Sequence, residues 1–183
     1  MLSYHALHDL VHRGVIDALP EQINGASIDV CLGSNLLIEC GSFDDPPAAV
    51  DLSKREALTF ARVTMGADGY ALQPGDFVLA ETLEMFHLPE DVAALFVLKS
   101  SMARAGLEHS QAGFADPHWH GSVLTLELKN ITAHHTLLLK PGMRIGQMVF
   151  FRVAPVPESK GYGVKGAYNR AGSVVATRNE VAA

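Results

Sequence analysis

The sequence contains few cysteines, no long apolar run and no excess of positive charge. Its 183 residues include two cysteines, Cys31 and Cys40, and neither belongs to a CxxC pair. Two cysteines are too few for a disulfide framework and do not suggest a zinc site, so we expect a reduced, cytoplasmic protein. The net charge of −6 argues against nucleic-acid binding, which needs clustered Lys and Arg.

The composition is typical of one globular domain that spans 1–183. Hydrophobic residues make up 48% and charged residues 19% of the chain, and a chain of this length buries a substantial core. The first 14 residues carry His, Asp and Arg among the apolar positions. We therefore expect neither a signal peptide nor a membrane anchor.

Periodicity predicts a mainly β fold, either a distorted barrel or a jelly roll, with a short N-terminal helix and one helical insert. Apolar residues at helical spacing place the first helix over 3–13, with Ser3 as N-cap, and KSSMARAG places the insert over 99–106. The runs SIDVCL and NLLIEC, separated by Gly33 and Ser34, predict a hairpin or adjacent strands. Further strands are expected at 58–64, 69–72, 76–83, 93–98, 122–130, 136–139 and 147–153.

Two segments without such patterns are expected to be loops. Residues 40–51 are rich in turn formers and predict an exposed loop. Residues 154–183 carry Gly, Pro, Ser and scattered basic residues. We expect this tail to be a flexible C-terminal lid that becomes ordered on binding.

Three features are candidates for chemistry, and each has a purely structural alternative. In SVLTLELKN, alternation places Glu127 on the face opposite the leucines, as either a reactive group or an exposed strand carboxylate. KSSMAR places two hydroxyls and two basic residues around a helix start, as either a phosphate site or an ordinary capped helix. His118 and His120 fall on one side of an extended HWH segment and are either metal ligands or solvated histidines.

Seven motifs in order make the chain resemble the dCTP deaminase family, a branch of the trimeric dUTPase-like (β-clip) fold. They are INGASIDVCLG (23–33), LQPGDFVLAETLE (72–84), LPEDV (88–92), LKSSMARAGL (98–107), AGFADP (112–117), LTLELKN (124–130) and PGMRIGQM (141–148). The resemblance implies a homotrimer with active sites between subunits and hydrolysis of dCTP to dUTP and ammonia, which supplies dUMP and dTTP synthesis. It also implies Mg²⁺ bound mainly through the substrate triphosphate.

The resemblance also assigns roles to individual residues. Glu127 corresponds to the general acid/base, and Ser100 and Arg104 to residues that a neighbouring subunit contributes. The expected substrate-binding residues are Lys99 and Ser101 for phosphates, the backbone of Ala112 and Gly113 for the base edge, Asp116 for the 3′-hydroxyl, Gln147 for the phosphate end, and Tyr162 and Lys165 in the lid. No protein metal ligand is expected, because the HxE and PCxxC motifs of zinc deaminases are absent.

The sequence departs from the family pattern at three places, one of which is His118 and His120, where small or acidic residues are common. Five residues separate Gly121 from Glu127 where four are expected, so we predict a β-bulge. The tail KGAYNRAGS differs from that of many relatives. The alternatives are a bifunctional enzyme that forms dUMP, which AGFADP favours although Gln111 replaces an expected Thr, a plain dUTPase, and a noncatalytic nucleotide-binding trimer.

Overall fold

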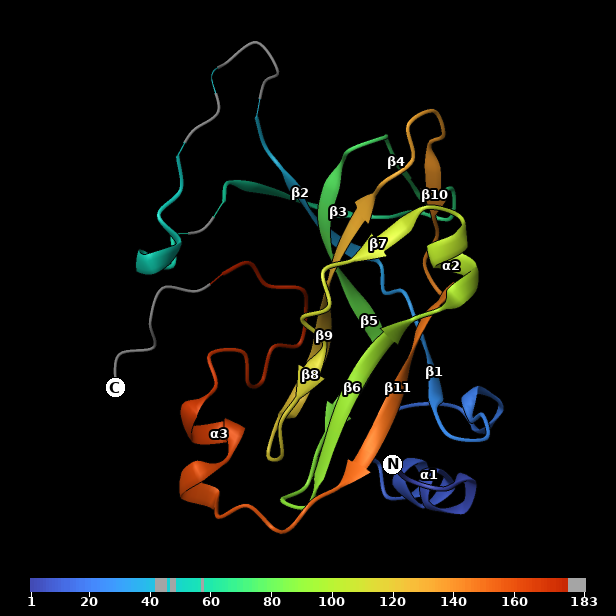
Figure 1. Cartoon of the computed structure of the whole chain (residues 1–183), viewed down its shortest axis with the longest axis vertical. Helices are drawn as coiled ribbons and strands as arrows, with labels where there is room; N and C mark the ends of the chain where they lie inside the picture. Colours follow the sequence, from blue (N-terminus) through green and yellow to red (C-terminus); the bar gives the residue numbers. More distant parts are fainter. Residues whose placement is uncertain (42–45, 47–48, 57, 178–183) are drawn as a thin grey trace.

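The structure is a computed structural model that describes residues 1–41, 46, 49–56 and 58–177 (Figure 1). The prediction of a mainly β protein is confirmed. Part of the predicted loop at 40–51 and the last six residues of the tail lie outside the described residues.

Three sheets hold the described chain together. The largest has the strand order β3-β2-β5-β9-β7, the second has the order β1-β11-β6-β8, and β4 pairs with β10. The strands are β1 (Ile28–Cys31), β2 (Asn35–Glu39), β3 (Phe60–Thr64), β4 (Tyr70–Leu72), β5 (Phe77–His87), β6 (Val92–Leu98), β7 (Leu107–His109), β8 (Phe114–Ala115), β9 (His120–Asn130), β10 (Leu137–Leu139) and β11 (Arg144–Arg152). Within the described residues the sheets do not close into one barrel, and a jelly-roll-like arrangement fits them.

The helices are short and lie at the edges of the sheets. They are α1 (Tyr4–His12), α2 (Ser100–Arg104) and α3 (Tyr162–Lys165), with single 3-10 turns at Pro20–Gln22, Leu52–Lys54 and Glu158–Lys160. The predicted first helix is confirmed: it buries Leu7 and Leu10 completely and is followed by Gly14 at a φ of 67°. Ser3 occupies the N-cap position, but its side chain makes no capping hydrogen bond. No helix in the described part of the chain reaches the length and hydropathy of a membrane span.

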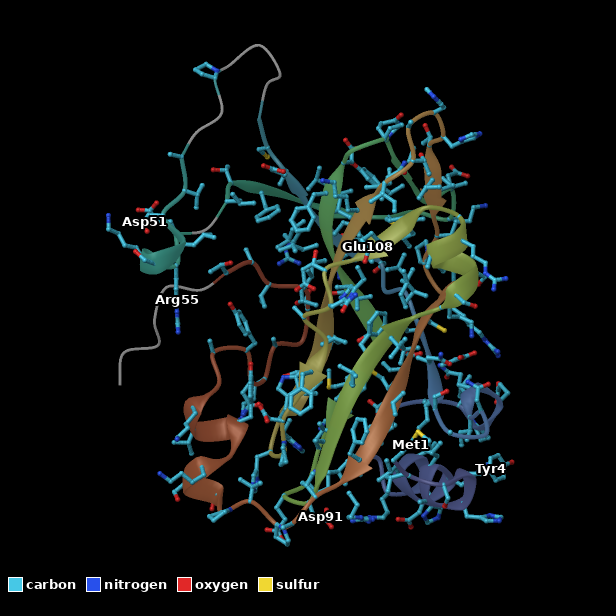
Figure 2. All side chains as sticks on the ribbon, viewed as in Figure 1. Met1, Tyr4, Asp51, Arg55, Asp91 and Glu108 are labelled. Carbon is cyan, nitrogen blue, oxygen red and sulfur yellow. The ribbon has the colours of Figure 1, made fainter. Side chains whose placement is uncertain are left out.

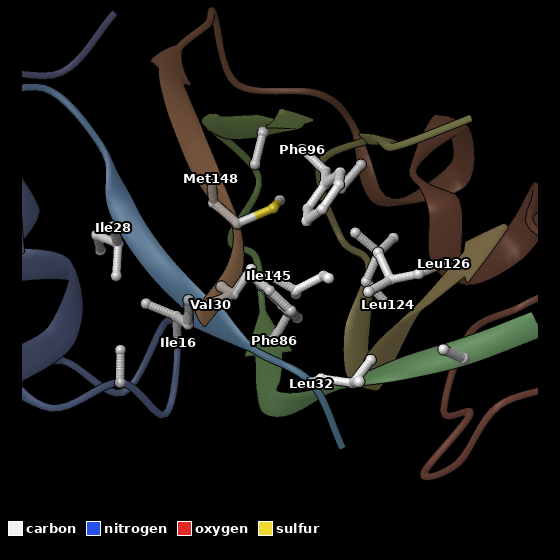
Figure 3. Packing of buried hydrophobic residues seen from close by; sticks show 14 of the residues in the cluster. Ile16, Ile28, Val30, Leu32, Phe86, Phe96, Leu124, Leu126, Ile145 and Met148 are labelled. Carbon is white, nitrogen blue, oxygen red and sulfur yellow. The ribbon is translucent and has the colours of Figure 1, made fainter. Parts of the chain in front are cut away.

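The core lies between the sheets and is built from the inward faces of their strands. Figure 3 shows part of it, in which side chains from β1, β5, β6, β9 and β11 converge. Leu126 and Leu128 of β9 are fully buried. Because side chains alternate along a strand, their burial turns Glu127 toward the other face of the sheet, as predicted.

The prediction that residues 27–32 and 35–40 form a hairpin or adjacent strands is wrong. β1 pairs with β11, whereas β2 pairs with β3 and β5 in the other sheet. Gly33 lies at this crossing, where its N–H donates to the Glu81 carbonyl at 2.8 Å. A Cβ at Gly33 would lie 2.5 Å from Glu81 Cγ, so the close approach requires glycine and the chain passes from one sheet to the other there.

β9 has a bulge at Gly121, directly before the stretch 122–126 in which one was predicted. Ser122 lies opposite Phe86 and His120 opposite His87, so Gly121 is an extra residue in β9. Its φ of 63° is in the left-handed region that glycine adopts at low cost. A second irregularity follows, because Met85 lies opposite Val123 and Glu81 opposite Thr125, so the extra residues there belong to β5. Beyond it, Glu127 lies opposite Leu79.

Candidate active site

Glu127 projects from the central strand β9 beside a buried histidine. Its Oε2 lies 3.2 Å from Nε2 of His109, and the two side chains are 24% and 3% exposed. The N–H direction does not meet the geometry of a hydrogen bond, so both atoms are buried without a partner among the described residues. A carboxylate oxygen and a ring nitrogen left facing each other in this way are unusual in a protein interior and mark a candidate reactive site.

His109 is the neighbour that sequence reasoning missed, because it lies between the motifs at 98–107 and 112–117. It ends β7, which pairs with β9, next to Glu108 that is labelled in Figure 2. Its ring packs against Phe96 with centroids 4.7 Å apart. Its Nδ1 accepts a hydrogen bond of 3.1 Å from the N–H of Gln111.

Glu127 lines a pocket of about 460 Å³, which we call the Glu127 pocket. The sheet side of the pocket is largely apolar and includes Phe77, Leu79 and Trp119. Ala112, predicted to contact the base, also lines it. Among the described lining residues there are two carboxylates, Glu56 and Glu127, and no Lys, Arg or His.

The C-terminal segment forms another wall of this pocket. Its pocket-lining residues are Tyr162, Tyr168, Ala171, Val175, Ala176 and Thr177. The N–H of Val123 in β9 donates to the Ala171 carbonyl at 2.9 Å, and Ser173 Oγ and the N–H of Val174 donate to the buried Glu81 carboxylate at 2.8 and 2.7 Å. The described tail is thus tied to the strand that carries Glu127, and its role as a flexible lid stays a prediction.

Three predicted binding residues gather in a second pocket of about 260 Å³. Asp116, Tyr162 and Lys165 line it together with Lys160. Tyr162 lines both pockets, so the Glu127 pocket and this cationic pocket are neighbours. The sequence predicted these three residues separately, and the structure brings them together.

Lys99 and Gln147 lie at another place, around the buried carboxylate of Asp29. Lys99 Nζ and Arg144 Nη1 contact the two oxygens of Asp29 at 2.8 and 3.2 Å. Burial alone raises the pKa of Asp29, but the hydrogen bonds from Lys99 and Asn24 and the charges of Lys99 and Arg144 outweigh it and lower the pKa. Gln147, opposite Asp29 in the β1–β11 pairing, accepts from Ser27 Oγ at 3.0 Å.

The helix α2 carries Ser100, Ser101 and Arg104 on its exposed surface. None of the three lines either pocket as far as the described residues go. In Figure 1, α2 and α3 lie on opposite sides of the molecule. A single chain therefore does not bring these residues to Glu127.

Gly113 lies next to Ala112 and is held close to β6. Its carbonyl accepts from the N–H of Phe96 at 2.9 Å. A Cβ at Gly113 would lie 2.6 Å from the Cβ of Phe96. This close backbone contact fixes the segment that leads from His109 toward Asp116.

The two histidines of HWH do not lie on one side of an extended segment, so that prediction is wrong. His118 has a left-handed φ of 67°, and its Nε2 lies 2.8 Å from the Val156 carbonyl. His120 Nε2 instead lies 3.3 Å from Nδ1 of His87. Burial and the nearby His87 and Arg170 lower the pKa of His120. In the part of the chain that the structure describes, no three His, Cys, Asp or Glu side chains form a group suited to a metal ion.

Comparison with known proteins identifies the family. A sequence model described as dCTP deaminase-like matches residues 1–153. A protein named dCTP deaminase, dUMP-forming, of Leifsonia xyli subsp. xyli is 53% identical over 95 residues, which cover 51% of this chain and 46% of that protein. A protein of the same name from Thermobifida fusca is 41% identical over 148 residues, which cover 79% of this chain and 71% of that protein.

A solved structure agrees at the level of the fold. The crystal structure of 2′-deoxycytidine 5′-triphosphate deaminase from Agrobacterium tumefaciens matches with a TM-score of 0.62 at 24% identity, covering 84% of this chain and 47% of that one. The chain spans about half the length of several of the curated relatives it matches. The match of the family over 1–153, together with the 41% identity to the Thermobifida fusca protein, shows that the chain belongs to the dCTP deaminase-like family.

Proposed function

We propose that the protein deaminates dCTP by hydrolysis and that Glu127 is the general acid/base. One observation carries this proposal: a carboxylate with a buried oxygen projects into a pocket beside Ala112, whose walls are otherwise largely apolar. Hydrolytic deamination needs a water that attacks C4 of cytosine and a proton that reaches N3. One positioned carboxylate does both, since it takes the proton of the water, delivers it to the ring and assists the departure of ammonia.

The neighbouring pocket supports a role for Asp116, Tyr162 and Lys165 in holding the rest of the nucleotide. In the proposal, Asp116 accepts a hydrogen bond from the 3′-hydroxyl and Lys165 faces the phosphates. Tyr162 borders both pockets, which suits a ligand with its base in one and its sugar and phosphates toward the other. In this scheme Mg²⁺ is bound by the triphosphate oxygens, because this hard cation prefers oxygen ligands.

The names of the curated relatives favour a second step that yields dUMP. The eight curated relatives compared are all named dCTP deaminase, dUMP-forming. In that step a second water attacks the α-phosphorus of dUTP and pyrophosphate leaves. We infer that this chain follows them, which makes dUMP and pyrophosphate the expected products in place of dUTP.

The charge of the Glu127 pocket supports a site completed by another subunit. Its described lining contains two carboxylates and no basic side chain, so that lining offers Glu127 no cationic partner. Ser100 and Arg104 lie on the exposed α2 and are not among the lining residues of this pocket. A homotrimer in which α2 of one subunit faces Glu127 of the next supplies the missing cation and a hydroxyl for the reacting water.

The products that the protein forms from dCTP distinguish deamination to dUTP, formation of dUMP and the absence of deamination. The protein is incubated with dCTP and Mg²⁺, and nucleotides and ammonia are measured with time. We expect ammonia together with dUMP; dUTP alone means deamination without the second step, and the absence of ammonia overturns the proposal. Glu127→Gln should lose deamination while it still binds dCTP, whereas Glu39→Gln, an exposed carboxylate in β2, should retain full activity.

Mixing two inactive variants tests the shared site. Glu127→Gln and Arg104→Gln each remove one part of the proposed site, and subunit exchange between them creates sites that contain both native residues. Recovered activity in the mixture supports a site between subunits. An active monomer in sedimentation, or no recovery after exchange that mass spectrometry has verified, contradicts it.

A further inference from the structure

We propose that His109 is a positioning residue that holds Oε2 of Glu127 through its Nε2–H and leaves the other oxygen, Oε1, to the reacting water. This inference rests on the proposed function, because it assigns His109 a role in the same reaction. The distance of 3.2 Å between the two atoms is within hydrogen-bond reach. In unliganded sites such bonds are commonly misaligned and tighten when the substrate binds.

The tautomer of His109 follows from its second contact. The backbone N–H of Gln111 points at Nδ1 from 3.1 Å, so Nδ1 must be the acceptor and carries no proton. A neutral ring then carries its proton on Nε2, which faces Glu127. The direction of the Gln111 N–H depends on a left-handed backbone, since Gln111 has a φ of 59°, a conformation that a non-glycine residue seldom adopts.

Burial makes the two oxygens of Glu127 different. Oε2 has essentially no solvent exposure, so the 24% exposure of the side chain comes from its other atoms. The His109 ring is 3% exposed and lies against Phe96. A hydrogen bond from a neutral donor to an ionised carboxylate is strong in such surroundings, and it limits the rotation of the group that must take a proton from water.

A pair of substitutions separates positioning from packing. His109→Gln keeps a donor near the place of Nε2, whereas His109→Phe keeps the ring and its contact with Phe96 but has no donor. We expect kcat for dCTP to fall roughly 10- to 100-fold in His109→Phe and less than about fivefold in His109→Gln, with KM changed less than about threefold in both. Unfolding in urea should show His109→Phe to be at least as stable as His109→Gln, because this apolar site favours the ring.

A merely structural histidine gives the opposite order of activities, with His109→Phe the more active variant, and that result overturns the inference. Long-range ¹H–¹⁵N spectra supply a readout without turnover: the proton of the His109 ring is expected on Nε2 in the unliganded protein, and a proton on Nδ1 contradicts the proposal. If the wild-type protein releases no ammonia from dCTP, the proposed function fails together with the positioning role. The ring spectra then still show whether Nε2, the nitrogen that faces Glu127, carries the proton.

Discussion

Glu81 connects the C-terminal segment to the central sheet, and its replacement by glutamine should destabilise both. Oε2 accepts from Ser173 Oγ at 2.8 Å and from the N–H of Val174 at 2.7 Å. Oε1 accepts from Nδ2 and N of Asn35 at 2.8 and 3.3 Å. Glu81 and Val174 are both buried, so the N–H of Val174 depends on this carboxylate for a partner.

An amide cannot replace the carboxylate, because one of its two ends is a donor. Whichever way the amide of the Glu81→Gln variant turns, its NH₂ group faces a backbone N–H, from Val174 or from Asn35. An unpaired buried N–H costs about 1–3 kcal/mol, and the remaining bonds lose the assistance of the charge. The expected loss is about 2–4 kcal/mol in the free energy of unfolding, a large part of the total stability of a domain.

Urea unfolding measures the loss in the free energy of unfolding, and hydrogen exchange measures the loosening of the C-terminal segment. Trp119, the only tryptophan, donates its indole N–H to the Tyr168 carbonyl at 3.2 Å, so its fluorescence reports on the docked tail. The amide of Val174 should exchange faster in Glu81→Gln, and Glu39→Gln is the exposed control. An unfolding free energy within about 0.5 kcal/mol of the wild type, with Val174 equally protected, would refute this account of how the tail is held.

Three further outcomes follow from buried groups elsewhere. Burial and the Glu84 carboxylate raise the pKa of the Cys31 thiol to about 11, so iodoacetamide at pH 7.5 should modify the exposed Cys40 first, as peptide mass spectrometry can show. The pKa of Asp29 is lowered in the folded state, so the wild type should be more stable than Asp29→Asn wherever this carboxylate is ionised. This advantage should be full above the unfolded pKa of about 3.9 and should shrink as the pH falls through the folded pKa. Urea unfolding at several pH values measures it. Leu126→Ala should lower the free energy of unfolding by about 2–5 kcal/mol in urea, since Leu126 is fully buried.

Local sequence patterns predicted much of the fold. Alternation along 122–130 predicted which face of β9 Glu127 occupies, and the burial of Leu126 and Leu128 confirms it. The count of residues after Gly121 predicted a bulge between Gly121 and Glu127, and the extra residue of β9 is Gly121 itself, at the edge of that stretch. These predictions succeeded because each depends on residues close together in the sequence.

Pairing between distant strands was harder to predict. Gly33 and Ser34 were interpreted as a hairpin turn, but the missing side chain of Gly33 serves a close approach to Glu81 and lets the chain pass between sheets. The strands β7 and β8 were not predicted, since three and two residues are too few to show a period. Turn residues mark where a strand ends and do not identify its partner.

Some residues of the candidate site meet within one chain and others do not, and this difference supports a site shared between subunits. Glu127, Ala112 and His109 meet because β7, β9 and the segment that follows β7 are neighbours within one chain. Lys99, whose ammonium is bound to Asp29, and Arg104 on α2 are not among the residues that line this pocket. A pocket that contains carboxylates and lacks basic side chains among its described lining cannot by itself attract a triphosphate. If the proposed substrate is correct, the cations must reach this pocket through an assembly of subunits or from the adjoining pocket of Lys160 and Lys165, and the mixing of inactive variants distinguishes these two sources.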